Sequence, residues 1–137
     1  MKIRRIVISV IAVILILIAG ATAAFMIIAS RYEKGMKELT INAVDASRLA
    51  DGVYTGSFYL LPNTSKVRVT IAGGRISSID LLSHLHGKGH SGEKIIDRII
   101  DKQSLQVDVI SGATGSSKVI LKAVGKAFIS GKSIAAN

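Results

Sequence analysis

The sequence predicts an α+β protein in which an N-terminal transmembrane helix precedes a small antiparallel sheet with two packed helices. An apolar run without charges comes first, and three segments rich in strand-forming residues follow it, separated by turn residues. Two amphipathic stretches come after the strands rather than between them, which excludes the βαβ units of a parallel sheet. With 137 residues, the chain has room for one small domain beyond the apolar run.

The apolar run covers residues 6–28. Its 23 uncharged residues would form a helix about 34 Å long, enough to cross a bilayer. Basic residues at positions 2–5 predict a single-pass protein of the cell membrane with its N-terminus in the cytoplasm, although residues 31–37 carry as many basic side chains. The length of the run favours a retained anchor that contacts membrane lipid, while the small residues at 19–23 leave a cleaved signal peptide open.

Four parts are expected along the chain: a membrane anchor, a stalk, a folded domain and a tail, at residues 1–30, 31–50, 51–131 and 132–137. The polar residues 31–39 are compatible with a helix and should extend the membrane helix. Residues 45–50 are expected to form another turn before Asp51 and Gly52 break it.

Three consecutive antiparallel strands are expected to open the domain. Residues 53–60 are rich in strand formers, and Leu61-Pro62-Asn63 has the chemistry of a turn. Residues 66–71 alternate polar and apolar side chains, as in a strand that covers a core with one face. The glycines in residues 72–75 predict a hairpin turn. The third strand, residues 76–82, has less regular apolar spacing and is expected to contain a bulge.

Two amphipathic helices are expected after the strands. Ser91 is a favourable N-cap for the first helix, in which four isoleucines between positions 95 and 100 lie on one face. This helix is expected to end near Gln103. Apolar residues from position 119 onward mark the last helix, which is expected to stop around Gly131.

Composition excludes several classes of function. The chain has no Cys, which rules out disulfides, thiolate zinc sites, Cys-ligated iron–sulfur clusters and Cys nucleophiles, so redox chemistry would need a bound organic cofactor. The 18 basic residues outnumber the 9 acidic ones, but no block of Lys and Arg stands out and aromatic residues are few. Nucleic acid is therefore not an expected partner.

A small, hydroxyl-rich segment lies between a short extended stretch at 107–110 and the last helix: Ser111, Gly112, Ala113, Thr114, Gly115, Ser116 and Ser117. Such a turn directs free backbone N–H groups at whatever lies above it, and the helix dipole adds partial positive charge, so a phosphate is the expected ligand. The alternative is that these residues only form the turn and cap the helix. A dinucleotide-binding fingerprint would need Gly where Lys118 stands, and the segment lacks the Gly-Lys-Ser/Thr of a P-loop.

Residues 103–117, Gln-Ser-Leu-Gln-Val-Asp-Val-Ile-Ser-Gly-Ala-Thr-Gly-Ser-Ser, closely resemble the signature of the FMN-binding domain family. Its most specific part, Asp-x-x-Ser-Gly-Ala-Thr, begins at Asp108. Residues 51–56, the hairpin at 67–79 and His84 support the resemblance. It covers about residues 51–130, nearly all of the chain after the stalk. The family includes the flavin-carrying domains of sodium-pumping NADH:quinone oxidoreductase, of the Rnf complex and of exported flavoproteins in extracellular electron transfer.

The resemblance implies that Thr114 accepts FMN through a phosphoester bond, which a Mg²⁺-dependent flavin transferase forms from FAD outside the cytoplasm. The C-terminal domain would then be extracytoplasmic. Asp108 would be recognised by the transferase or would fix the turn. Small side chains in the loop allow close approach of the phosphate and the transferase. The expected cofactor-binding residues are Asp108, Ser111, Gly112, Ala113, Thr114, Gly115, Ser116 and Ser117.

With FMN attached, the protein is expected to relay electrons at the cell surface or within a membrane redox complex. It would not act as a stand-alone catalyst, and no catalytic residues are expected. A quinol or a membrane dehydrogenase is the expected electron donor. Two alternatives stay open: a non-covalent FMN binder in which the same loop holds the phosphate, and a non-redox sensor or binding module that keeps the fold.

Three histidines, His84, His86 and His90, lie in a Gly-rich stretch at spacings typical of a metal tract. No carboxylate lies between them, and the stretch is expected to connect a strand to a helix, where polar residues are common. No metal site is therefore expected. Titration of the histidines could tune a redox couple without a bound metal.

Overall fold

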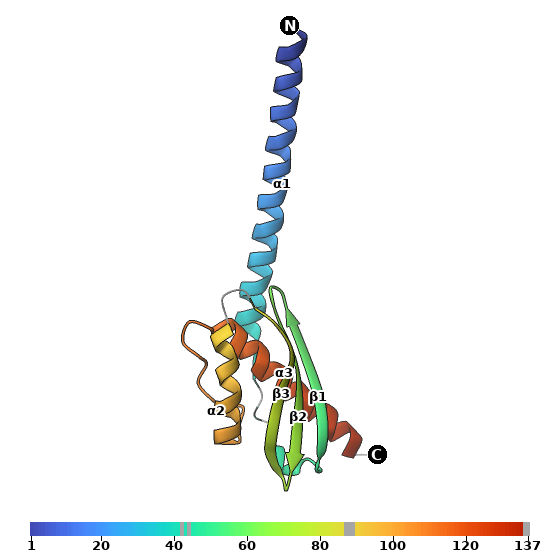
Figure 1. The fold of residues 1–137 in the computed structure, drawn as a ribbon, viewed down its shortest axis with the longest axis vertical. Coiled ribbons are helices and arrows are strands. Elements are labelled where there is room, and N and C mark those ends of the chain that lie inside the picture. The colour runs from blue at the N-terminus through green and yellow to red at the C-terminus, as the bar shows by residue number, and fades with distance from the viewer. Residues whose placement is uncertain (42, 44, 87–89, 136–137) are drawn as a thin grey trace. The chain divides into compact units, whose positions relative to one another are not determined.

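The computed structural model describes residues 1–41, 43, 45–86 and 90–135. The chain divides into two compact units, Met1–Lys34 and Gly35–Asn137. Among the described residues, the second unit holds a three-stranded antiparallel sheet, two α-helices and two short 3-10 helices (Figure 1). The predicted α+β class is confirmed.

The N-terminal helix, α1, spans Lys2–Glu38 and contains the whole predicted apolar run. None of its side chains is buried in the described structure. By length and composition, it is the one described helix that is suited to cross a membrane. The helix continues to Glu38, so the polar residues after the apolar run extend it, as expected.

The sheet has the strand order β1-β2-β3, with β1 at Gly52–Leu60, β2 at Asn63–Ala72 and β3 at Arg75–Leu85. Gly73 and Gly74 form the second turn with φ of 60° and 69°, the positive values of a tight hairpin turn. The first turn consists of Leu61 and Pro62. The prediction that Asn63 belongs to this turn is wrong, because Asn63 pairs across the hairpin as the first residue of β2.

The central strand, β2, buries every second side chain from Asn63 to Ile71, as its predicted alternation requires. β3 departs from this regular pattern at two places, where Ser77 and Leu82 have no partner on β2. The expected irregularity of the third strand is thus confirmed, as two β-bulges.

The last helix, α3, spans Thr114–Ala135 and covers the buried face of the sheet (Figure 1). Gly56 of β1 lies against the α3 backbone at Ala123 and Ala127, where a Cβ atom would overlap both residues. The close approach of helix and strand therefore depends on a residue without a side chain. The core between them is mainly aliphatic, with Val67, Val69, Ile71, Ile120, Val124 and Phe128 at its centre.

The predicted end of α3 around Gly131 is wrong, since the helix continues to Ala135. A Cβ at Gly131 would lie 2.8 Å from a ring carbon of Tyr54. This glycine therefore allows the Tyr54 ring to pack against the helix, and it does not serve as a helix stop.

Two short 3-10 helices complete the second unit. The first, η1, spans Ala46–Arg48 and confirms the turn expected there; the Asp45 side chain caps it by accepting a hydrogen bond from the Ser47 N–H at 3.0 Å. Hydrogen bonds from Ser47 lower the pKa of the Asp45 carboxyl. The second, η2, spans His90–Lys94 and leads directly into α2, Ile95–Lys102.

The predicted N-cap at Ser91 is wrong. Ser91 lies inside η2, and the residue before α2 is Lys94, which makes no side-chain capping bond. The 3-10 turn carries the chain into the helix, so α2 begins three positions later than the cap predicts.

Gln103 ends α2, as expected, in the left-handed conformation with φ of 52°. Its Oε1 accepts a hydrogen bond from the Ile76 N–H at 2.7 Å, and its Nε2 donates to the carbonyl oxygens of Ile76 at 3.0 Å and Ile100 at 2.7 Å. One side chain thus joins the end of α2 to the start of β3. This fixes the point from which the chain continues toward α3.

Candidate functional site

The loop before α3 makes a tight turn at residues 110–113. The Ala113 N–H donates to the Ile110 carbonyl oxygen at 3.0 Å, and Gly112, the third residue of the turn, has φ of 76°. A positive φ at this position is the mark of a type II turn and favours glycine. A Cβ at Gly112 would meet nothing within 4 Å, so the backbone conformation, not a lack of space, requires glycine here.

The helix α3 begins directly after this turn. The Ser117 N–H donates to the Ala113 carbonyl oxygen at 2.9 Å, so Ala113 is the residue that precedes the helix. Alanine has no side-chain oxygen to cap a helix, and the N–H groups of residues 114–116 have no acceptor within the helix. The first turn also contains no acidic side chain. Among the described residues, the first turn of α3 therefore supplies no negative side chain of its own to the positive end of the helix.

The four hydroxyl side chains of the loop have different surroundings. Ser111 and Thr114 are exposed, and neither side chain has a hydrogen-bond partner among the described residues. Ser117 is buried, and its Oγ accepts a hydrogen bond from the Ile110 N–H at 3.1 Å, which holds the turn in place. Ser116 is buried, and its Oγ has no partner in the described structure. Of the remaining predicted residues, Gly112 and Asp108 are exposed, Gly115 is half-buried and Ala113 is buried.

Asp108 lies just before the turn. Arg98 of α2 donates from Nη1 to the carbonyl oxygens of Asp108 at 2.8 Å and Val109 at 3.4 Å, which fixes the backbone of this segment. The carboxylate of Asp108 has no partner among the described residues. Arg98 and Asp108 also line a cleft of about 500 Å³. Arg98 was missed by the sequence analysis, because an exposed arginine on a helix carries no signal of the carbonyl groups it reaches.

The structure places His84 inside β3, so the prediction that it follows the strand is wrong. Residues 87–89 of the Gly-rich stretch lie outside the described residues. The His84 ring lies against Glu93 of η2, with 3.1 Å between Nδ1 and Oε1. This hydrogen bond lowers the pKa of the Glu93 carboxyl, positive charge on nearby histidines adds to the effect, and burial opposes it. The sequence analysis did not connect Glu93 with the histidines.

The start of α3 fits a phosphate group. Within the part of the chain that the structure describes, three backbone N–H groups at this helix start lack acceptors and no carboxylate lies in the first turn. The helix dipole adds partial positive charge. Lys118 adds a positive charge one turn further along; its Nζ donates to the Met36 carbonyl oxygen at 3.4 Å. The exposed hydroxyl of Thr114 stands at the first position of the helix. A phosphate held here would have a nucleophilic oxygen next to it.

Two comparisons with known proteins bear on this site. The model of a family described as FMN-binding domain matches residues 63–128, which include the turn and the start of α3. An uncharacterized protein of Treponema pallidum (strain Nichols) is 34% identical over 83 residues, which are 58% of this chain and 23% of that protein. This chain thus spans about a quarter of the length of that relative.

Proposed function

We propose that the protein is a membrane-anchored flavoprotein of the FMN-binding domain family, whose model matches residues 63–128, and that it carries FMN on Thr114 and relays electrons outside the cytoplasm. One observation supports the site: the exposed Thr114 hydroxyl lies at a helix start whose first N–H groups have no acceptor among the described residues. The FMN phosphate needs both features, because one of its oxygens is replaced by the hydroxyl oxygen and the others need donors.

In the proposed attachment step, the Thr114 oxygen bonds to the phosphorus of the FMN half of FAD. The bond from that phosphorus to AMP breaks, AMP leaves, and the hydroxyl proton passes to a base of a flavin transferase. No electron is transferred in this step. The exposure of Thr114 supports it, because a second protein must reach the hydroxyl. We propose that the unpartnered carboxylate of Asp108, six residues earlier and also exposed, contacts the transferase.

FMN, when bound, supplies one-electron and two-electron transfer, and the chain supplies position and charge. The backbone N–H groups of Thr114, Gly115 and Ser116 would hold the phosphate, and the exposed hydroxyl of Ser111 would be available as a further donor. The buried Ser117 keeps the turn closed through its bond from Ile110. No acid, base or nucleophile beyond Thr114 is needed for electron relay.

The membrane topology is part of the same proposal. The apolar run of α1 supports an anchor, and the basic residues at positions 2–5 favour a cytoplasmic N-terminus. The domain that follows would then meet a transferase outside the cytoplasm and accept electrons from a quinol or a membrane dehydrogenase. A covalent bond suits this location, because a released cofactor would be diluted, whereas a tethered one keeps a high effective concentration at the membrane.

The proposal is tested by producing the full chain in cells that contain a flavin transferase and measuring the visible flavin spectrum of the purified protein. We expect the colour to remain with the protein after acid precipitation, to bleach with dithionite and to return in air. Thr114→Val should be colourless, while Thr55→Val, a matched change at an exposed threonine of β1, should keep the flavin. A colourless wild type in cells that flavinylate a known carrier would contradict attachment, and a bound flavin that does not bleach would contradict electron relay.

A further inference from the structure

A β-bulge turns a histidine of β3 into the interior. Leu81 pairs with Val67 on the buried face, and Leu82 is then left without a partner. The bulge shifts the alternation by one residue, so that His84 pairs with Ser65, whose side chain is buried. The His84 side chain is accordingly only 2% exposed.

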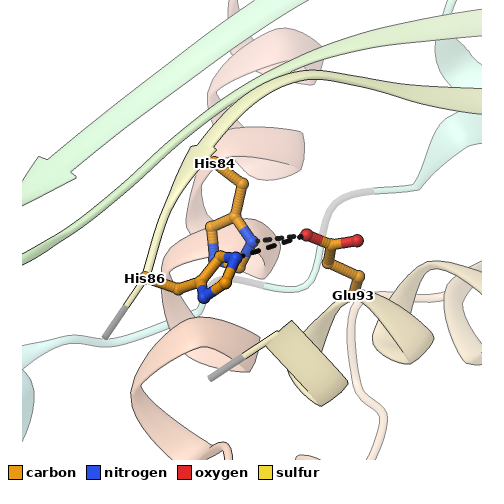
Figure 2. A group of neighbouring side chains, drawn as sticks. All are labelled: His84, His86 and Glu93. Carbon is orange, nitrogen blue, oxygen red and sulfur yellow. Dashed lines mark hydrogen bonds and ion pairs between the residues drawn. The ribbon is translucent and has the colours of Figure 1, made fainter. Parts of the chain in front are cut away.

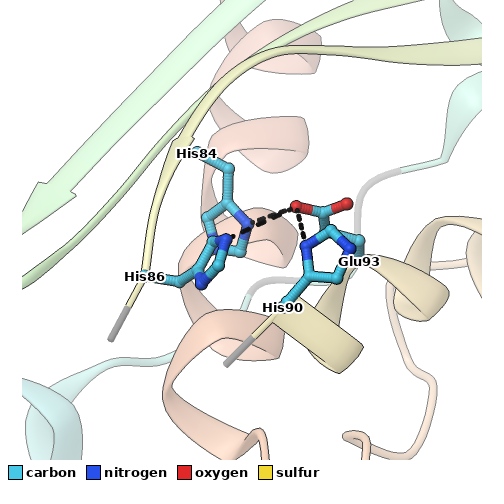
Figure 3. A network of polar contacts seen from close by, with 4 residues as sticks. All are labelled: His84, His86, His90 and Glu93. Atoms are coloured by element: carbon cyan, nitrogen blue, oxygen red, sulfur yellow. Dashed lines mark hydrogen bonds and ion pairs between the residues drawn. The ribbon is translucent and has the colours of Figure 1, made fainter. Parts of the chain in front are cut away.

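Four side chains meet at this end of β3. His84 lies in β3 and His86 directly follows it, and η2 brings Glu93 and His90 against them (Figures 2 and 3). Each histidine directs one ring nitrogen at the same carboxylate oxygen, Glu93 Oε1. The distances to that oxygen are 3.1 Å from His84 Nδ1, 4.0 Å from His86 Nε2 and 3.2 Å from His90 Nδ1.

The separations of His84 and His90 from Glu93 are close to those between the ligands of a metal ion, whereas His86 lies farther away, at 4.0 Å. Zinc bonds of about 2.0–2.2 Å at tetrahedral angles place neighbouring ligand atoms about 3.3–3.5 Å apart. The ligand atoms of His84, His86 and Glu93 all lie within 4.8 Å of one another. A small rotation of the half-exposed His86 would bring its nitrogen to the required distance.

The cluster also has polar capacity that the chain does not use. His84 Nε2 and His86 Nδ1 are buried and have no partner among the described residues. These are the ring nitrogens opposite the ones that face Glu93, and in a metal-bound histidine that second nitrogen is hydrogen-bonded to a water or another acceptor. One carboxylate oxygen, Glu93 Oε1, faces three imidazoles. This oxygen has two lone pairs, so it cannot accept a well-aligned hydrogen bond from each ring.

We propose that His84, His86 and Glu93 bind a divalent transition-metal ion of the zinc class, with His90 as a more exposed fourth ligand. Two or three imidazoles with one carboxylate suit Zn²⁺ and its neighbours rather than Mg²⁺ or Ca²⁺, which prefer oxygen ligands. The site could not be predicted from the sequence, because no carboxylate lies between the histidines. Glu93 comes from the next element and completes the set only in the folded chain.

The metal would connect two elements of the domain, β3 and η2. His84 and His86 belong to or directly follow β3, and Glu93 belongs to η2. The neighbouring Gly92 packs against Ser116 in the first turn of α3. A cation in the cluster would therefore join the end of the sheet to the segment that supports the start of α3, and its binding should raise the Tm. It requires no flavin.

The test is a Zn²⁺ titration of the full chain in detergent, without a histidine tag, by calorimetry near pH 7.5. We expect one Zn²⁺ per chain and a rise in Tm. Glu93→Gln should weaken binding about tenfold or more, and His86→Gln similarly. The matched control Asp97→Asn, an exposed carboxylate on α2, should bind as the wild type does. Absence of stoichiometric binding, or equal affinity in Glu93→Gln, would overturn the proposal.

A second measurement needs no variant and covers the case in which Glu93→Gln fails to fold. The chain contains 3 histidines, all in this cluster, so side-chain NMR can follow each imidazole. One equivalent of Zn²⁺ should shift the signals of His84 and His86 together. A shift confined to the exposed His90, or no shift, would contradict the site.

Discussion

Gly92 and Ser116 are in such close contact that a Cβ added to Gly92 would lie 2.6 Å from the Ser116 Cβ and 3.2 Å from the backbone nitrogen of Ser117. The glycine belongs to η2 and the serine to the first turn of α3. The histidine–glutamate cluster and the proposed flavin-binding loop are therefore linked through one packed contact. A substitution in η2 should therefore disturb the start of α3, and a substitution at the start of α3 should disturb η2.

Gly92→Ala tests this contact. The added methyl group cannot fit without moving the start of α3, and such overpacking typically costs about 1–3 kcal/mol in the free energy of unfolding. Chemical denaturation of the purified chain measures the loss. Ser91→Ala, at the exposed neighbour, should change the stability little. Equal effects of the two changes would show that the contact is not tight in solution.

Ser116 and Ser117 form a matched pair of buried serines with opposite expected behaviour. Ser117→Ala removes the acceptor of the Ile110 N–H and should cost about 1–3 kcal/mol in the free energy of unfolding. Ser116→Ala removes a hydroxyl without a partner in the described structure and should be neutral or stabilising. Denaturation of the flavin-free protein compares them. If Ser116→Ala lowered the free energy of unfolding as much as Ser117→Ala does, the Ser116 hydroxyl would have a partner, which would contradict the account.

A comparison of alanine substitutions at Gly112 and Gly73 distinguishes the effect of backbone strain on stability from a role of the turn in flavin attachment. Both have a positive φ and open space around the position of a Cβ, so alanine at either should cost about 1–2 kcal/mol in stability. Gly112 lies in the turn before Thr114, and Gly73 lies in the hairpin between β2 and β3. Flavin incorporation should fall in Gly112→Ala and remain normal in Gly73→Ala. Equal incorporation in both would show that attachment does not depend on the turn.

The local sequence predicts the sheet because each strand carries its own evidence. The alternation of β2 and the Gly73-Gly74 turn determine a hairpin without help from the rest of the chain. Apolar spacing likewise locates α2 and α3. The ends of these elements were harder to predict, because Ser91 and Gly131 have local signals that packing overrides. Ser91 falls in a 3-10 turn, and Gly131 accommodates the Tyr54 ring.

The candidate site was predictable where it is one continuous segment. Asp108 to Ser117 can be found from the sequence because the turn, the helix start and the hydroxyls are neighbours in the chain. The Glu93 contacts were not predictable, since they depend on a bulge at Leu82 that reverses which residues of β3 face inward. Arg98 and Gln103 act on backbone groups of distant residues, and such contacts leave no pattern in the sequence.

The most direct test of the account is the intact mass of the chain produced with a flavin transferase, measured for the wild type, Thr114→Ser and Thr114→Val. We predict a gain of one FMN less one water in the wild type, retention of some modification in Thr114→Ser, and none in Thr114→Val. An unmodified wild type beside a modified positive control would contradict covalent attachment. A modified Thr114→Val would place the flavin on another residue and contradict the assigned site.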